Sequence, residues 1–394
     1  MRQTLPSLRL TGATILRDGA LQQRSLAFAD GRITRGPLPE VDLTGYLILP
    51  GIIDLHGDAF ERHISPRPSA PFALETGLRA TDRDAAANGV TTAWLAQSWS
   101  WEGGTRGPDF AISLMDALAE YRAQTTLTDL RLQIRCETHT VETEARLLDA
   151  VRRHRIDYVV FNDHLDEAEH MLSARPEEFH FWAKRLGRTG EAHHAALLAA
   201  QRQRREVPRY LCRLAEQFDA LGVTYGSHDD PDGETRETYS MIGAKICEFP
   251  TARPAAALAR AVGDPILMGA PNVVRGGSQA GNIAATELIR AGLCDALVSD
   301  YYYPALAQAA FRLADDGVLP LAAAWDMISG RPADILRLHD RGRLDPGLRA
   351  DMVVIDPSTR AIEATISGGR ITHLAGEAAH RFAHAPQRTA IAAE

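Results

Sequence analysis

The segment "LPGIIDLHGDAFERH", residues 49–63, carries the strongest indication of the fold. Its apolar run ends in His56-Gly57-Asp58. Packing alone does not require a histidine and a carboxylate at the end of an apolar strand. Residues i and i+2 of an extended strand point the same way, so His56 and Asp58 can reach one ion together. The segment therefore predicts a β-strand that presents a functional pair at its C-terminal end.

The same pattern recurs from residue 51 to about residue 340, where short apolar runs alternate with longer helix-like segments. Such alternation is typical of an α/β fold with a parallel sheet, either a closed barrel or a doubly wound sheet. The candidate strands are 51–58, 90–97, 130–139, 157–164, 223–230, 244–250, 265–274 and 294–303.

Short β-like segments flank this region on both sides. Residues 8–49 alternate apolar and polar side chains with Asp-Gly turn signals, and a β pattern returns up to residue 372. We expect a small β domain from 1–50 and 346–380, a main domain over 51–345, and a loose tail over 381–394, within a final stretch that is rich in Ala and His.

The connection between the fourth and fifth candidate strands, residues 165–222, is longer than one crossover helix needs. It is rich in charge and predicts at least two helices. Two interpretations stay open: a surface insertion, or a lid over the active face that uses Lys184, Arg185 and Arg188 to contact an anion.

Polar residues end nearly every candidate strand. In an eight-stranded barrel the C-terminal strand ends meet on one face, where the active site lies. We therefore expect one site built from many strands. The residues concerned are His56, Asp58, Glu137, His139, Asn162, Asp163, His164, His228, Asp229, Asp230, Lys245, Glu248 and Asp300.

Imidazole nitrogens and carboxylate oxygens suit zinc, manganese or iron, and the absence of thiolates at these positions favours a catalytic site over a structural zinc site. A bound cation would lower the pKa of a coordinated water toward neutrality. Asp300 can bind the metal and also accept a proton, with His228 as a second candidate. The role of His139 is undecided, and Glu248 can instead pair with Lys245 or an arginine.

Composition excludes several classes of protein. The formal net charge is −8, which disfavours nucleic acid or an acidic membrane as partner. The four cysteines form no CxxC pair, which argues against a disulfide framework and favours a cytoplasmic location. No apolar stretch reaches the roughly 18 residues that span a bilayer. Oligomeric state is not determined by these features, and a homo-oligomer stays open.

The strand ending in His-x-Asp after "LPGIID", the later strand-end histidines and Asp300 resemble the amidohydrolase superfamily of metal-dependent hydrolases. The flanking segments "ADGRITRG", "GRLDPGLRADMVVIDP" and "ISGGRIT" are similar to its split β-sandwich. The resemblance covers roughly residues 8–375. It implies a (β/α)8 TIM-like barrel with a small β-sandwich domain formed by both termini.

A closer resemblance is to the PhnM family of phosphonate catabolism, through "LPGIIDLHGDAFERHISPRP", "FNDH", "GSHDD", "GAPNVVRGGSQAGN" and "SDYYYPA". It implies hydrolysis of α-D-ribose 1-methylphosphonate 5-triphosphate, a small anionic phosphorylated sugar, to the 5-phosphate and pyrophosphate. It also implies one or two divalent ions, most simply Zn, with Mn or Fe as alternatives and Mg accompanying the triphosphate. The implied metal ligands are His56, Asp58, Glu137, His164, His228 and Asp300.

Two positions depart from the wider superfamily. Asp58 replaces the usual second histidine of the first strand, and no lysine stands where a carboxylated bridging lysine is often found on the fourth strand. Glu137 can take the bridging role, so the number of metals stays open.

Substrate phosphates need cationic and backbone donors. The loop "NVVRGGSQAGN" follows the seventh strand, offers such donors and leads into a helical pattern from Ile283. It can form an anion-binding site at a helix N-terminus, or it can be only a tight turn. Other side chains outside this loop are also candidate substrate contacts. Each of them can instead be exposed to solvent, paired with a neighbouring charge or packed against the barrel. The candidate substrate-binding residues are Arg275, Gly276, Gly277, Ser278, Lys245, Arg62, His63 and Tyr301.

Two rival functions remain from the residues alone. Another reaction of the same superfamily, such as deamination or deacylation of a small amide, suits the strand ends equally well because fold and metal do not determine the substrate. A non-catalytic scaffold is the second rival, although such a protein would be expected to lose its metal ligands.

Overall fold

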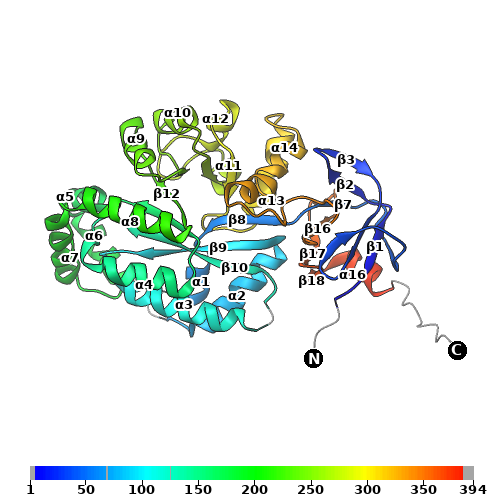
Figure 1. Ribbon diagram of the computed structural model, residues 1–394, viewed down its shortest axis with the longest axis horizontal. Helices are drawn as coiled ribbons and strands as arrows, with labels where there is room; N and C mark the ends of the chain where they lie inside the picture. The colour runs from blue at the N-terminus through cyan, green and yellow to red at the C-terminus, as the bar shows by residue number, and fades with distance from the viewer. Residues whose placement is uncertain (1–4, 68–69, 125, 385–394) are drawn as a thin grey trace.

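The centre of the molecule is an eight-stranded parallel sheet, shown in Figure 1. The computed structural model describes residues 5–67, 70–124 and 126–384. The sheet runs in sequence order, each strand pairing in parallel with the next. Its strands are β8 (Ile52–Gly57), β9 (Val90–Trp99), β10 (Asp129–Glu137), β11 (Tyr158–Asn162), β12 (Thr224–His228), β13 (Ile246–Glu248), β14 (Ile266–Gly269) and β15 (Ala296–Val298).

The first and last strands of this sheet meet, which closes it into a barrel. The backbone N–H of Asp58 donates to the carbonyl of Asp300 at 2.7 Å, and the N–H of Asp300 donates to the carbonyl of His56 at 3.0 Å. A parallel bridge also joins Gly57 to Asp300. The expected (β/α)8 barrel is therefore confirmed, and the closure places the ends of β8 and β15 side by side.

The barrel strands are buried on both faces because helices cover the outside and side chains fill the inside. Residues of β8 to β15 are rich in Val, Ile, Leu and Ala, as expected for a parallel sheet that is covered on both faces. Ile53, Leu55, Trp94, Tyr158 and Val160 pack in the interior cluster. The opposite faces of the strands join the larger cluster under the helices.

Helices follow most strands, and short ones cap the barrel ends. They are α1 (Phe60–Ile64), α2 (Leu74–Ala87), η1 (Gly104–Arg106), α3 (Pro108–Arg122), η2 (Val141–Thr143), α4 (Glu144–His154), α5 (Leu165–Ala174), α6 (Pro176–Arg185), α7 (Gly190–Gln203), α8 (Val207–Leu221), α9 (Gly233–Met241), α10 (Arg253–Val262), α11 (Ala270–Arg275), α12 (Ala285–Arg290), α13 (Ala305–Asp315), α14 (Leu321–Asp326), α15 (Gly330–Ile335) and α16 (Gly376–Ala383).

Local sequence explains where the helices begin and end. Helix α10 has Pro254 in its first turn, where the missing N–H costs nothing, and ends at Gly263 with φ 82°. Helix α8 repeats the arrangement with Pro208 and with Gly222 at φ 69°. Glycine is suited to these left-handed C-terminal positions because it has no Cβ.

Two smaller sheets are built from both ends of the chain and lie at one end of the molecule (Figure 1). One has the order β5-β4-β1-β6 and the other β18-β17-β16-β7-β2-β3. Their strands are β1 (Leu8–Thr11), β2 (Thr14–Arg17), β3 (Ala20–Gln23), β4 (Leu26–Ala29), β5 (Arg32–Thr34), β6 (Glu40–Asp42), β7 (Leu47–Pro50), β16 (Met352–Ile355), β17 (Ile362–Ser367) and β18 (Arg370–Leu374). Because β7 pairs with β16, the two termini share one small sheet domain.

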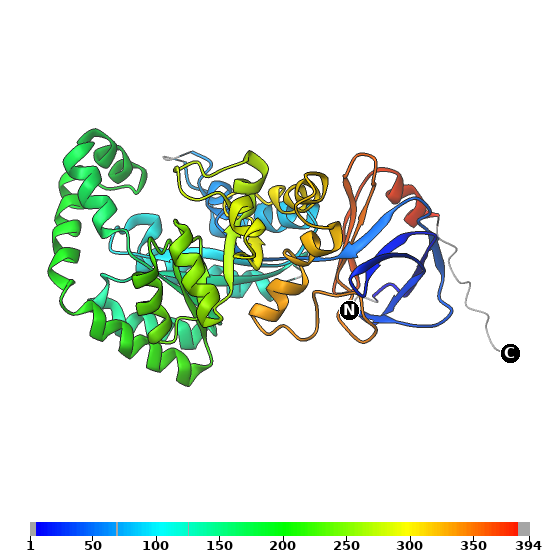
Figure 2. The ribbon, with the colours of Figure 1, turned by 90° about the horizontal axis from the view of Figure 1, so that it is seen from above.

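The 165–222 connection contains four helices, and they divide into two groups. Helix α8 buries Tyr210, Leu214 and Phe218 in the main core and so serves as the crossover helix before β12. Helices α5 to α7 form a separate cluster around Phe179 and Leu197, and Figure 2 shows them at the end of the molecule away from the terminal sheets. The helical insertion therefore consists of α5 to α7, and α8 belongs to the barrel.

Two predictions about elements were wrong in part. The candidate strand 265–274 ends at Gly269, and its second half is helix α11. Residues 381–383, expected in the loose tail, form the end of α16, whose Ala378 packs in the cluster of the terminal sheets. His193, on α7, is buried against Trp101 and Phe179. Most of the predicted tail lies outside the described residues.

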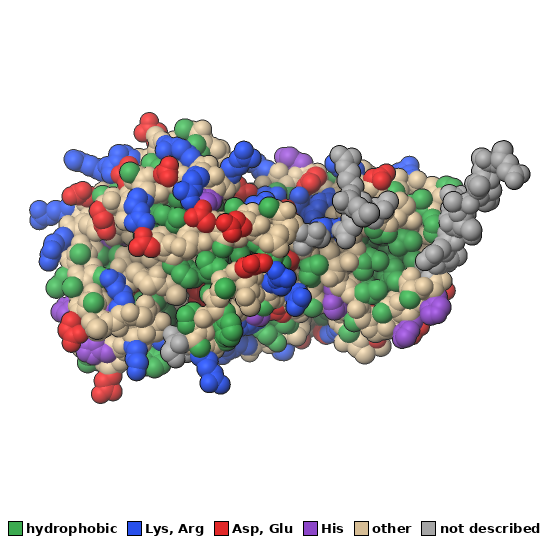
Figure 3. All heavy atoms as spheres, turned by 90° about the horizontal axis from the view of Figure 1, so that it is seen from below, with side chains coloured by type: hydrophobic (Ala, Val, Ile, Leu, Met, Phe, Trp, Pro, Cys, Tyr) green, Lys and Arg blue, Asp and Glu red, His purple; other side chains and the backbone are tan. Residues whose placement is uncertain are grey.

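Surface and membrane features agree with the composition. Within the described ranges no helix is both long and apolar enough to cross a bilayer. Lys, Arg, Asp and Glu side chains are interspersed on the face shown in Figure 3. All four cysteines are free thiols, and Cys136 and Cys247 are buried.

The N-terminal end of the barrel is held by a buried ion-pair network around Asp129, the first residue of β10. Arg341 donates to its Oδ2 from Nη1 at 2.8 Å and Arg131 from Nη2 at 3.1 Å. Burial would raise the pKa of Asp129, but these two guanidinium groups outweigh burial and hold it at about 2. The folded state therefore prefers the ionised carboxylate.

We expect Asp129→Asn to cost about 2 kcal/mol of unfolding free energy near neutral pH, since the ordinary Asp pKa is about 3.9. Because the pKa of Asp129 is lower in the folded state, its ionised carboxylate stabilises the fold at pH values above the unfolded-state pKa. This stabilisation is lost as the pH falls toward the folded-state pKa. The difference in unfolding free energy between wild type and variant, measured by urea unfolding, should therefore shrink by about half between pH ~5 and ~3. Asp109→Asn, at a 93% exposed side chain, is the control. A pH-independent difference would contradict the prediction.

Candidate metal centre

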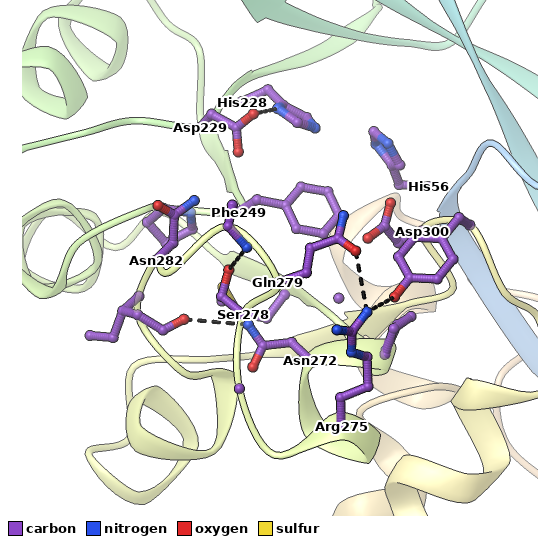
Figure 4. A pocket seen from close by; sticks show the side chains of 18 of the residues that line it. His56, His228, Asp229, Phe249, Asn272, Arg275, Ser278, Gln279, Asn282 and Asp300 are labelled. Carbon is purple, nitrogen blue, oxygen red and sulfur yellow. Dashed lines mark hydrogen bonds and ion pairs between the residues drawn. The ribbon is translucent and has the colours of Figure 1, made fainter. Parts of the chain in front are cut away.

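A cavity of about 300 Å³ opens at the C-terminal ends of the barrel strands, and we call it the central cavity. Figure 4 shows His56, His228, Asp229 and Asp300 along one part of it and Arg275 across from them. Of the six predicted metal ligands, four line this cavity directly: His56, Asp58, His228 and Asp300.

The seam between β8 and β15 brings His56, Asp58 and Asp300 together. Ser299 donates two hydrogen bonds to the Asp54 carboxylate, from its backbone N–H at 2.8 Å and from its hydroxyl at 2.6 Å. These bonds hold β8 and β15 in register below the site. A Cβ at Gly57 would lie 2.7 Å from Asp54 Oδ2, so glycine is needed there for close approach. The β8–β9 register also shifts between Asp54 and Gly57, an irregularity of the kind that re-aims side chains beside active sites.

Glu248 determines which nitrogen of His56 is available. Its Oε2 accepts from His56 Nδ1 at 2.8 Å, and its Oε1 accepts from Gln133 Nε2 at 2.8 Å and from the Tyr158 hydroxyl. Burial would raise the pKa of Glu248, but His56 lowers it, so the carboxylate accepts and His56 Nδ1 carries the proton. The Nε2 atom of His56 is then left for an ion, as in metal sites where a carboxylate orients a ligating histidine.

A second group of ligand-type residues adjoins the first. Glu137 accepts from His164 through both the ring Nδ1 and the backbone N–H, the latter at 3.2 Å. Burial would raise the pKa of Glu137, but His164 holds it at about 2. Asp229 connects the two groups: its Oδ2 lies 2.8 Å from His228 Nδ1 and 3.9 Å from His164 Nε2. Glu137 and His164 thus lie behind Asp229 and do not line the central cavity.

Arg135 stands among these acidic and imidazole groups. It is on β10, two residues before Glu137, and its Nη1 lies 3.9 Å from Asp58 Oδ2. Its side chain is only 12% exposed, and it lines the central cavity. A guanidinium in this place offers hydrogen-bond donors to an anion that enters the cavity.

The donor set fits a divalent cation. His56, His228 and Glu248 each offer a ligand atom within 4.8 Å of the others. Burial raises the pKa of Asp58, and the charge of Asp300 raises it further. Burial lowers the pKa of His228 to about 4, which favours the neutral ring that can ligate. A neutral His228 imidazole beside carboxylates that repel each other is an environment that a Zn²⁺-type ion stabilises.

The loop after α11 forms the other wall of the central cavity. Arg275, at the end of α11, lies 3.2 Å from Gln279 Oε1 and 3.4 Å from the Tyr301 hydroxyl through Nη1. Gly277 and Ser278 line the cavity, whereas Gly276 ends α11 at φ 81°. The loop follows the C-terminus of α11 and leads into α12, which begins at Ala285, two residues after the predicted Ile283, so the anion cradle stays a prediction. Any anion binding here must use Arg275 and loop polar groups.

Three predicted substrate contacts lie away from the central cavity. Lys245 precedes β13, is 58% exposed and donates to the Ser240 carbonyl at 2.9 Å, so it points outward. His63 pairs with Asp84 at 3.1 Å on the outer side of α1. Arg62 donates to Asp84 and to the carbonyl of Tyr301, both at 3.0 Å, while Tyr301 itself lines the cavity.

Several cavity residues were missed by sequence reasoning. The cavity-lining residues absent from the predicted set include Arg135, Phe249, Asn272 and Asn282. Arg135 could have been found, because it lies two residues from Glu137 on the same strand and so on the same face. Glu248 was placed among the strand-end site residues, with pairing to Lys245 or an arginine as the alternative, and it contacts His56.

Comparisons with known proteins agree with this architecture. A family model described as "Amidohydrolase family" matches residues 213–373. The crystal structure of an amidohydrolase superposes with a TM-score of 0.63 at 14% identity, covering 94% of this chain and 100% of that one. N-acetylglucosamine-6-phosphate deacetylase from Pasteurella multocida superposes with a TM-score of 0.59 at 12% identity, covering 93% and 99%. At these identities the two structures support the fold alone.

One relative shows more than the fold. Alpha-D-ribose 1-methylphosphonate 5-triphosphate diphosphatase of Escherichia coli (strain K12) is 33% identical over 341 residues, which cover 83% of this chain and 87% of the relative. The aligned region is long enough to include most of the barrel. By this identity and coverage, the chain belongs to the PhnM family of alpha-D-ribose 1-methylphosphonate 5-triphosphate diphosphatases.

Proposed function

We propose that this hydrolase acts on α-D-ribose 1-methylphosphonate 5-triphosphate and releases pyrophosphate, leaving the 5-phosphate. The observation that supports it best is the central cavity, where a metal-competent group faces Arg275 across one space. The cation site and the arginine suit a reacting phosphate joined to further phosphates. The relative named for this reaction supports the same substrate class.

His56 and His228 would hold a divalent cation, with Asp58 and Asp300 as carboxylate ligands and Glu137, His164 and Asp229 next to them. Such a cation would supply Lewis acidity and an activated water at neutral pH. Glu248 keeps His56 in the tautomer whose Nε2 faces the ion. Zinc suits this nitrogen and oxygen set, and manganese or iron are the alternatives.

The chain's own residues then have separate tasks. Asp300 accepts a proton from the attacking water, since it lies at the seam beside His56 and Asp58. Arg135 donates to the oxygens of the reacting α-phosphate, where negative charge grows during the reaction. Arg275 and Ser278 bind the β- and γ-phosphates, which depart as pyrophosphate.

The purified, metal-loaded protein should release pyrophosphate from the triphosphate, as measured by a coupled pyrophosphate assay. Arg275→Gln should raise KM about tenfold or more, because a charge-assisted contact to phosphate contributes about 1.5–3 kcal/mol. Arg290→Gln, at an exposed arginine of α12 outside the cavity lining, is the matched control and should behave as wild type.

A panel of small amides and nucleoside-type amines tests the rival reaction. Turnover of an amide without pyrophosphate release from the triphosphate would overturn the proposed function. The absence of both activities in protein that carries metal would favour the scaffold interpretation.

We also propose that the enzyme works in the cytoplasm. The support is indirect: all four cysteines are free thiols and the two in the barrel core are buried. Such thiols suit a reducing compartment. Cell fractionation with an antibody against the chain tests the location.

A further inference from the structure

A cavity of about 340 Å³ lies toward the end of the barrel opposite to the central cavity, and we call it the lower cavity. It opens between the C-terminal ends of the neighbouring helices α3 and α4 (Figure 1), next to the first half of β10 and the residue before β11. Among the described residues, none lines both cavities. A molecule in the lower cavity would therefore not touch the candidate metal centre.

The lining of the lower cavity is basic, although the chain as a whole has a formal net charge of −8. Of the described residues, Arg122, Arg131 and Arg155 line it against one carboxylate, that of Asp157. Like charges around one cavity repel each other, and low-dielectric walls strengthen the repulsion. An anion that enters the lower cavity would relieve it.

Arg131 and Asp157 largely neutralise each other within a network of hydrogen bonds. Arg131 donates to Asp157 Oδ2 from Nη1 at 2.9 Å and to Asp129 Oδ2 from Nη2 at 3.1 Å. Asp157 Oδ1 also accepts from Trp94 Nε1 at 2.9 Å. Because these groups are already paired, an anion would have to be attracted by the other two arginines.

Arg122 and Arg155 have guanidinium groups that can reach an anion in the lower cavity. The Arg122 side chain is 49% exposed, and its Nη2 lies 4.0 Å from Asp129 Oδ1, which is beyond hydrogen-bond distance. Arg155 is exposed, and in the described part of the chain it has no carboxylate within ion-pair distance. Both side chains can therefore donate to a phosphate without breaking an existing hydrogen bond.

His154 adds a neutral donor to the same lining. Its Nε2 accepts from Arg153 Nε at 3.1 Å, which places the ring proton on Nδ1, whereas Asp116 lies farther from Nε2, at 3.5 Å. Burial lowers the pKa of His154 and the charge of Arg153 lowers it further, which favours the neutral ring. The Nδ1 proton is then left as a hydrogen-bond donor.

The apolar side chains of the lining limit the size of the ligand's organic part. The large ones are at most 7% exposed, so they offer little surface to an organic group; they are Met115, Leu118, Leu132 and Ile156. Their burial does, however, provide the low-dielectric wall that strengthens a contact between a guanidinium group and an anion. The cavity therefore suits a compact anion.

We propose that the lower cavity is a second anion site, which binds a small phosphate-bearing molecule through Arg122, Arg155 and the Nδ1 proton of His154. The site is separate from the metal centre and does not depend on the proposed function. Its ligands share one chemistry, a phosphate group with little or no organic part, which inorganic phosphate, pyrophosphate and a small sugar phosphate all have.

The two arginines also have a structural use, because cations stabilise the negative end of a helix dipole. Arg122 is in the last turn of α3, and Arg155 directly follows α4. Arg155 has φ 53°, a left-handed conformation that glycine adopts more easily. Arg155→Gly therefore removes the guanidinium group while relieving the backbone, so the variant should fold as wild type does.

Calorimetry with pyrophosphate and the metal-loaded, full-length protein tests the proposal. Wild type should bind two pyrophosphates per chain, one in each cavity. Arg155→Gly should weaken one site about tenfold or more and leave the other unchanged, because charge-assisted hydrogen bonds are lost. Arg275→Gln should have the converse effect. Arg337→Gly is the matched control, since Arg337 is also exposed with φ 55° but lies outside the lining, and it should keep both sites.

A second pair of variants separates anion binding from the helix dipole. Arg122→Gln should weaken the same site as Arg155→Gly about tenfold. Arg290→Gln removes an exposed arginine from the last turn of α12, outside the lining, and should change neither site. Pyrophosphate binding that Arg155→Gly and Arg122→Gln both leave unchanged would overturn the proposal and leave the arginines with a structural role.

Two further titrations identify the source of the phosphate group. Inorganic phosphate and ribose 5-phosphate replace pyrophosphate in wild type and in Arg155→Gly. Tighter binding of ribose 5-phosphate than of phosphate at the site that Arg155→Gly weakens assigns it to a sugar phosphate, and the reverse order assigns it to an inorganic anion. A single pyrophosphate site that Arg155→Gly abolishes would support the lower cavity and count against the proposed role of Arg275. A single site that only Arg275→Gln weakens would overturn the lower-cavity proposal alone.

Discussion

Asp300→Asn should lower the rate of pyrophosphate release about a thousandfold or more, while the protein stays folded. The change removes both a carboxylate ligand and the proposed proton acceptor but keeps the side chain's size. The backbone should tolerate it, because Asp300 has φ 55° and Asn adopts left-handed conformations as readily as Asp. The assay is pyrophosphate release, with thermal unfolding to check the fold.

Asp30→Asn provides the matched control for this variant. Asp30 also has a left-handed backbone, φ 52°, but lies exposed in a turn of the terminal sheets. It should keep full activity. Full activity of Asp300→Asn in the metal-loaded protein would remove Asp300 from the mechanism, and loss of folding alone would reduce its role to closing the barrel.

Chelation of divalent cations should abolish pyrophosphate release, with a loss of about a thousandfold or more, since the cation provides both the activated water and charge stabilisation. Adding Zn²⁺ or Mn²⁺ back should restore the rate. His56→Ala should lower the metal content of the purified protein, because it removes a nitrogen ligand that Glu248 orients. Elemental analysis of the protein measures this independently of activity.

His194→Ala is the control for metal content, since His194 is an exposed histidine of α7. It should bind as much metal as wild type. Undiminished turnover in chelated protein with no measurable metal would contradict the metal-centre assignment, and so would an unchanged metal content in His56→Ala.

Much of this architecture can be predicted from the sequence. The eight barrel strands follow from apolar runs separated by helix-like segments, and each predicted strand overlaps one in the structure. His56, Asp58, His228 and Asp300 were found because they end such runs, and the barrel brings strand ends to one face. Both observations depend on local sequence alone.

The contacts between strands could not be predicted in the same way. Glu248 was predicted to lie at the site or to pair with a basic residue, but its partner could not be named, and it is His56, 192 positions away along the chain. Lys245, three residues earlier, was expected to contact substrate but precedes the short strand β13 and points to solvent. The exposure of Lys245 depends on the residue at which β13 begins, and pairing with the neighbouring strands determines that residue.

The sequence by itself thus determined the order of strands and helices, the strand-end residues that line the central cavity and the family. Only the tertiary structure decided that Glu248 contacts Nδ1 of His56, and that Arg135 stands among the acidic groups of the cavity. The physical reason is the range of the forces involved. Strand periodicity and helix ends are properties of a few neighbouring residues, whereas these contacts arise only when barrel closure and register bring distant side chains together.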